Sequence, residues 1–93
     1  MSSLAMASVC TLREAAEFKA QLMAQVGREG DVEIDTASLG KIDTAGLQLL
    51  LAFARQLDAE GRGLSWTQHN PELYRAAEQL GLVDALKLPA TEA

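Results

Sequence analysis

The sequence predicts a single α/β domain, in which a small mixed or parallel sheet is covered by helices. Short apolar segments typical of strands alternate along the chain with longer segments whose apolar residues recur every three or four positions, as in helices. The length of 93 residues fits one domain over residues 1–93, and 48% of the residues are hydrophobic, as in ordinary globular proteins. Because strands joined by helical crossovers usually pair in parallel, this order of segments indicates a layered sheet.

The chain begins with a loosely alternating segment, Ser3 to Val9, which is long enough for one short strand. Thr11 and Glu14 then have the spacing of a capping box, in which both side chains satisfy free N–H groups at a helix start. Apolar residues at three- and four-residue steps predict a helix from about Leu12 to Val26, ending near Gly27.

The best candidate for a central strand is Val32 to Asp35, where apolar and charged residues alternate. This alternation places Glu33 and Asp35 on one face of the strand, toward solvent. We therefore do not expect this carboxylate pair to perform acid/base catalysis. Residues 36–40 are small and polar apart from Leu39, and they predict a loop.

The strongest helix prediction covers Ala45 to Glu60. Leu47, Leu50, Leu51 and Leu57 fall on one face of this helix, which should pack on the sheet.

Glycines stop that helix, and residues 64–67 predict another short strand. Asn70 and Pro71 then open a third helix that ends at Gly81. Residues 82–86 are compatible with one more helical turn, and residues 89–93 should form a frayed tail.

The charge of the chain argues against two classes of partner. A net charge of −5 and scattered basic residues do not suit nucleic acid or an anionic membrane surface. No segment approaches the roughly 18 consecutive apolar residues of a spanning helix, and the start of the chain lacks the features of a signal peptide. We expect no membrane insertion and a cytoplasmic location.

The sequence also lacks the usual signs of an enzyme. Cys10 and His69 are the only cysteine and histidine, so neither a metal site nor a cysteine–histidine pair is expected. Phosphate-binding glycine motifs are missing, and no cofactor is implied. We expect a binding protein rather than a catalyst.

The segment from Asp43 to Leu47 is the most informative part of the chain. It lies where a loop enters the most apolar helix, so that Asp43 or Thr44 is the natural N-cap. On spacing alone, both residues are explained by a purely structural role as helix caps.

The pattern Ile-Asp-Thr-Ala-Gly-Leu, preceded by Val-Glu-Ile-Asp, resembles the signature of the STAS family of sulphate transporters and anti-sigma factor antagonists. Residues 61–66 and 70–82 are similar to the strand and helix that follow in that family. In the antagonists, the hydroxyl residue after the aspartate is phosphorylated by an anti-sigma factor that is also a Ser/Thr kinase. The resemblance therefore implies that Thr44 is a phosphoacceptor.

The same resemblance implies a stand-alone bacterial switch that binds its partner through Asp43, Thr44, Ala45 and Gly46. In the leading interpretation, the partner is an anti-sigma factor kinase. Two alternatives remain open: the STAS subunit that docks on the ATPase of a phospholipid ABC transporter, and the STAS protein of a chemotaxis-type kinase system. All three are protein-binding roles, and they differ only in the partner.

Overall fold

Three parallel strands form the central sheet of the structure, a computed structural model that describes residues 2–89. The strands are β1 (Ser2–Ala5), β3 (Val32–Asp35) and β5 (Leu64–Trp66), and their order is β1-β3-β5. Ile34 lies opposite Leu4 on one side and Trp66 on the other. The α/β fold class and the central strand at 32–35 are thus confirmed.

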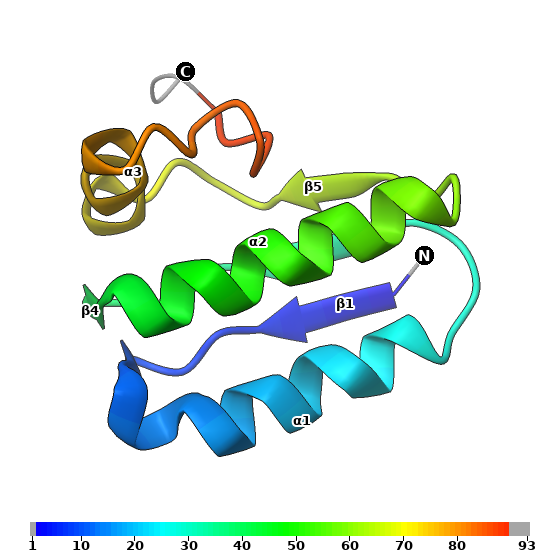
Figure 1. Ribbon diagram of the computed structural model, residues 1–93, viewed down its shortest axis with the longest axis horizontal. Helices are drawn as coiled ribbons and strands as arrows, with labels where there is room; N and C mark the ends of the chain where they lie inside the picture. Colours follow the sequence, from blue (N-terminus) through cyan, green and yellow to red (C-terminus); the bar gives the residue numbers. More distant parts are fainter. Residues whose placement is uncertain (1, 90–93) are drawn as a thin grey trace.

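Three α-helices accompany the sheet. They are α1 (Ala15–Val26), which follows a 3-10 turn at Leu12–Glu14, α2 (Thr44–Ala59) and α3 (Pro71–Gln79). Figure 1 shows α1 and α2 side by side on one face of the sheet, with α3 beyond one end of it. The connections from β1 to β3 and from β3 to β5 both move one strand in the same direction along the sheet. Because such connections are right-handed, α1 and α2 lie on the same face.

The core lies between this helix pair and the sheet. Val32 and Ile34 point into it from β3 and are fully buried. The predicted apolar face of α2 is confirmed, since the four leucines expected on it are buried: Leu47, Leu50, Leu51 and Leu57. The opposite face of β3 carries the partly exposed carboxylates of Glu33 and Asp35, as expected.

One strand prediction was wrong. The segment expected as a single strand from Ser3 to Val9 is divided into β1, which ends at Ala5, and β2 (Val9–Cys10). β2 pairs in parallel with β4 (Lys41–Ile42), which the sequence did not predict as a strand. The change of partner occurs at Ser8, whose carbonyl accepts hydrogen bonds from the N–H groups of Gly40 and Lys41.

The segment after α3 closes the molecule beside β5. Trp66 Nε1 donates a hydrogen bond of 2.9 Å to the carbonyl of Leu86, a fully buried residue. The N–H of Leu86 in turn bonds to the carbonyl of Leu82, which gives the single helical turn that the sequence allowed. Of the expected tail, residues 90–93 lie outside the described part of the chain.

Just after the C-terminal end of α2, Arg62 is buried and joins three segments. Its guanidinium donates to the carbonyls of Gln25 and Val26 at the end of α1, and to the carbonyl of Gly30. It also pairs with Glu60 at 3.0 Å. In this way Arg62 supplies a donor to the Val26 carbonyl, which the end of the helix leaves without an intrahelical partner, and a further donor to the Gln25 carbonyl, which also accepts the N–H of Arg28.

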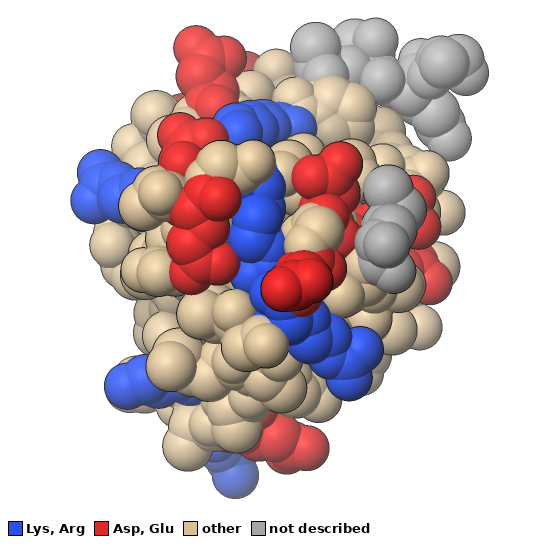
Figure 2. Space-filling view, turned by 90° about the vertical axis from the view of Figure 1, so that its right-hand side faces the viewer, with Lys and Arg blue, Asp and Glu red and all other residues tan. Residues whose placement is uncertain are grey.

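Charges of both signs alternate over the end of the molecule seen in Figure 2, where basic side chains lie among acidic ones. Lys87 pairs at 3.0 Å with Asp58, the second-to-last residue of α2. The basic side chains of this face therefore do not form the uninterrupted positive patch that binding to nucleic acid requires.

Candidate functional site

The candidate site lies where β4 ends and α2 begins. Asp43 is the N-cap of α2, with the extended backbone typical of that position. Its two carboxylate oxygens have different partners: Oδ1 accepts the N–H of Gly46 at 3.1 Å, and Oδ2 accepts the N–H of Leu12 at 2.9 Å. Asp43 therefore joins the starts of two helical segments that are 31 residues apart in the sequence.

These two N–H donors lower the pKa of the Asp43 carboxyl group, with the bond from Leu12 as the larger cause and the bond from Gly46 second. The carboxylate is thus ionised at neutral pH, next to the positive end of the α2 dipole. A carboxylate of lowered pKa is a weak base, so its geometry suits a structural role better than proton transfer.

Thr44 is the first residue of α2 and is exposed. Its hydroxyl makes no hydrogen bond to any residue between 2 and 89, because Asp43 already caps the helix. The Thr44 hydroxyl is therefore accessible at the N-terminus of a 16-residue helix, where the helix dipole favours an added negative charge.

The two small residues that follow differ from each other. Ala45 is half-buried, but Gly46, which we expected on the partner-binding surface, is buried. A Cβ atom on Gly46 would lie 2.4 Å from the carbonyl oxygen of Cys10 and 2.8 Å from Cγ1 of Ile42. The physical reason for glycine at this position is therefore the close packing of α2 on β2 and β4, and not the approach of a partner.

Gly46→Ala should accordingly lower the free energy of unfolding by about 1–3 kcal/mol, the usual cost of forcing extra atoms into a packed site. In an open helix position the same change would stabilise the fold, because alanine is the better helix former. Urea denaturation measures the effect. Gly27→Ala is the matched control, since a Cβ there meets only the Ala24 carbonyl at 3.8 Å; equal stability of the two variants would contradict the packing argument.

A hollow of about 180 Å³ lies directly beside Thr44, between α2 and α3. Its walls are mainly apolar and include Ile42, Leu47, Ala76 and Leu80. Leu80, at the end of α3, is a large apolar side chain that is 45% exposed. We call the surface formed by Asp43, Thr44, Ala45 and this hollow the α2-start surface.

Sequence reasoning missed two parts of this surface. Leu80 follows Leu73, Ala76 and Ala77 at helical spacing, and nothing in this spacing marks it as exposed. The bond from Leu12 to Asp43 was also missed, because a side-chain contact across 31 residues leaves no local pattern. The one available signal for the hollow was the position of Leu80 just before Gly81, at a helix end.

Two other side chains, Cys10 and His69, could take part in chemistry, but neither lines the hollow. Cys10 is buried, and this burial raises the pKa of its thiol, which disfavours the reactive thiolate. His69 Nδ1 lies 3.3 Å from the carbonyl oxygen of Pro89, and its ring contacts Tyr74. Among residues 2–89, no three His, Cys, Asp or Glu side chains come together in a way that could hold a metal ion.

None of the helices in the described part of the chain has both the length and the apolar character needed to cross a membrane.

The pKa of Asp43 gives a pH prediction. A carboxyl group whose pKa is lower in the folded state stabilises the fold above its unfolded pKa of about 3.9, and this contribution is lost as the pH falls through the folded pKa. Asp43→Asn keeps a cap for Gly46 but replaces the acceptor of the Leu12 N–H by a donor. The variant should be less stable than wild type at pH 7, and the difference should shrink below about pH 4.

Denaturant unfolding at a series of pH values tests this prediction. Glu14 and Glu60 also have lowered pKa values, but they are present in both proteins, so their contributions cancel in the comparison. A difference in stability that stays the same from pH 7 to pH 3 would show that the Asp43 charge is not involved.

Comparisons with known proteins agree with the fold. A family model described as "Mlab, STAS domain" matches residues 2–89. The crystal structure of a sulfate transporter family protein from Wolinella succinogenes is similar, with a TM-score of 0.75 and 19% sequence identity. This similarity covers 91% of the present chain and 70% of the other chain. No curated protein matches the sequence.

Proposed function

Because the chain belongs to the STAS domain family, we propose that it is a protein-interaction switch, which binds a partner at the α2-start surface and releases it when Thr44 is phosphorylated. The observation that carries this proposal is the exposed Thr44 hydroxyl, which has no hydrogen bond within residues 2–89 and lies beside the apolar hollow. A partner can cover the hollow and the hydroxyl together.

The chemistry of phosphorylation fits this geometry. A phosphate group would add about −1.5 to −2 charges and three acceptor oxygens at Thr44. The α2 N-terminus tolerates this charge, so the fold is preserved, but a partner that contacts the neutral hydroxyl and the apolar wall at Leu80 would have to bury an unpaired charge. Phosphorylation would then act on binding and not on folding.

In this proposal the domain is a binding module and a substrate, not an enzyme. In the described part of the chain, Asp43 is the only titratable group that lines the hollow, and its lowered pKa makes it a poor general base. Thr44 would receive a phosphate from the partner or from a separate kinase.

Two partners are consistent with the surface. The first is an anti-sigma factor that is also a Ser/Thr kinase. The second is the ATPase subunit of a phospholipid ABC transporter, with the domain as its small docking subunit. The description of the matching family model names Mlab rather than an anti-sigma factor antagonist, and this observation favours the second candidate.

Affinity purification from the native host separates the two candidates. The wild-type chain is used as bait beside Thr44→Glu, and the retained proteins are identified by mass spectrometry. A retained kinase that phosphorylates Thr44 in the presence of ATP supports the first candidate, and a retained transporter ATPase supports the second. If the wild type and Thr44→Glu retain the same proteins in equal amounts, Thr44 has only a structural role.

A further inference from the structure

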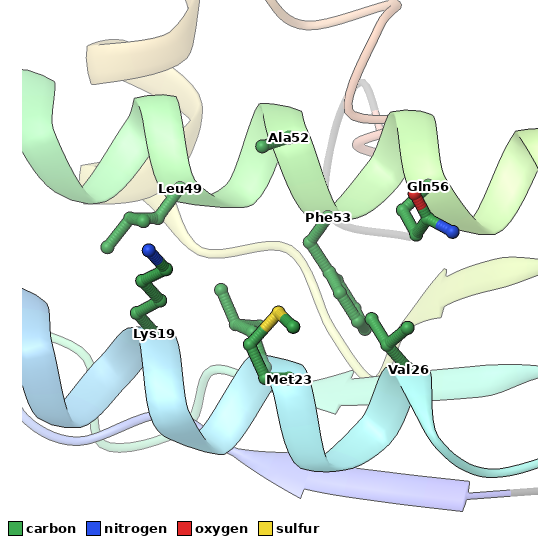
Figure 3. Close-up of a pocket in the computed structure, with 8 residues that line it drawn as sticks. Lys19, Met23, Val26, Leu49, Ala52, Phe53 and Gln56 are labelled. Atoms are coloured by element: carbon green, nitrogen blue, oxygen red, sulfur yellow. The ribbon is translucent and has the colours of Figure 1, made fainter.

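A second, larger groove runs between α1 and α2, away from the α2-start surface. Its volume is about 370 Å³, within the usual range for sites of small molecules. Leu22 and Phe53, which are 4% exposed, form its floor, and Met23 and Ala52 are exposed on its rims. Figure 3 shows Met23, Ala52 and Phe53 among the side chains that line the space between the two helices. The groove thus opens to solvent over an apolar floor.

Of the residues from 2 to 89, Lys19 is the only charged one that lines this groove. In Figure 3 its side chain rises from α1 toward Leu49 on α2, at one end of the groove. None of the ion pairs among residues 2–89 includes Lys19, and the α1 positions three and four residues away from it are alanine, leucine or methionine. Its charge is therefore not compensated on its own helix, although acidic residues outnumber basic ones by 13 to 8 in the chain.

The shape of the groove limits what can occupy it. Its lining on α1 extends from Lys19 to Val26, which corresponds to about 10 Å along a helix. An α-helix with its side chains is itself about 10–12 Å wide, whereas neighbouring packed helices have axes only about 8–10 Å apart. A narrow unbranched chain can reach the floor at Leu22 and Phe53 along its whole length, whereas a third helix would lie on top of the groove and reach this floor only with its side chains.

From these observations we propose that the groove binds a free medium-chain fatty acid. The acyl chain lies over Leu22 and Phe53 toward Val26, and the carboxylate pairs with Lys19. This site uses the middle of α2, whereas the α2-start surface uses its first turn, so either proposal can fail without the other.

Calorimetric titration of the purified chain with hexanoate, octanoate and decanoate, each below its micelle-forming concentration, tests the proposal. Each two-carbon step should tighten binding by about 15-fold, because every buried methylene contributes about fourfold. Lys19→Gln should weaken octanoate binding by about two- to fivefold and leave the binding of neutral octanol unchanged. Arg55→Gln is the matched control, since Arg55 is exposed on α2 and does not line the groove; it should bind octanoate like wild type.

A groove-filling variant, Ala52→Phe, keeps the test independent of charge. Ala52 is exposed, so the variant should fold, which circular dichroism checks, but its ring should occupy the groove and abolish binding. In amide NMR spectra, octanoate should shift the signals of Met23 and Ala52. Absence of binding, equal affinity of Lys19→Gln and wild type, or a dimer of the chain that is lost in Ala52→Phe would each overturn the proposal.

Discussion

Leu50→Ala should lower the free energy of unfolding by about 2–5 kcal/mol, the range found when a buried leucine is shortened and a cavity remains. Leu50 is 1% exposed and points from the middle of α2 into the core between the helices and the sheet. The whole stability of a domain is usually about 5–15 kcal/mol, so this loss should be visible as a large shift of the urea midpoint.

Leu12→Ala is the matched control, because it removes the same atoms from a side chain that is 72% exposed. It should change the free energy of unfolding by less than about 0.5 kcal/mol. If Leu50→Ala cost no more than Leu12→Ala, the packing of α2 on the sheet would be wrong.

Arg62→Ala is expected to have a similarly large effect, about 3 kcal/mol or more, although Arg62 belongs to no hydrophobic cluster. Its loss removes the donor to the carbonyl groups of Val26 and Gly30, and one of the donors to the carbonyl of Gln25, which keeps the N–H of Arg28. Arg62 is 9% exposed, so in the wild type its guanidinium, and not solvent, satisfies these bonds.

Two further variants separate geometry from charge at this position. Arg62→Lys keeps the positive charge but has no planar fork that can reach several carbonyls, so it should recover only part of the loss. Arg55→Ala removes an exposed arginine from α2 and should be nearly neutral. Full recovery of stability by Arg62→Lys would mean that charge alone, and not the set of three carbonyl contacts, explains the effect.

The elements with long periodic patterns were predicted from the sequence with small errors at their ends. α2 was expected at Ala45 to Glu60 and is found at Thr44–Ala59, because the apolar face and the Asp43 cap are both local signals. β3 has its predicted bounds, and α3 begins as expected with Asn70 accepting a hydrogen bond from the N–H of Leu73. Apolar patterns and capping residues, which are local signals, are therefore sufficient to predict these elements.

The pairing of β2 with β4 could not be predicted, for a physical reason. Each strand has two residues, and such a short segment has no period that distinguishes it from a loop. Their pairing depends on the carbonyl of Ser8 meeting the N–H groups of Gly40 and Lys41, and this contact is decided by the whole fold.

At the start of α2, the sequence predicted the cap at Asp43 or Thr44, and the structure has it at Asp43, but the expectation that Gly46 faces a partner does not agree with its burial. Glycine permits close approach of any neighbour, and the sequence does not show whether that neighbour is a partner or the chain itself. Here the neighbour is the Cys10 carbonyl, 36 positions earlier in the chain. The contacts of Arg62 could not be predicted either, because its partners in α1 are more than 30 residues away in the sequence.

The affinity of the captured partner for Thr44 variants tests the proposed switch most directly. Thr44→Ala should bind like wild type or slightly more weakly and should keep its stability, since the hydroxyl does not cap α2. Thr44→Glu should bind at least about tenfold more weakly, because it buries an unpaired charge in the contact. Ala20→Glu, which adds the same charge at an exposed position of α1 outside the α2-start surface, should retain wild-type affinity. Wild-type affinity of Thr44→Glu, or an equal loss in Ala20→Glu, would contradict a switch at Thr44.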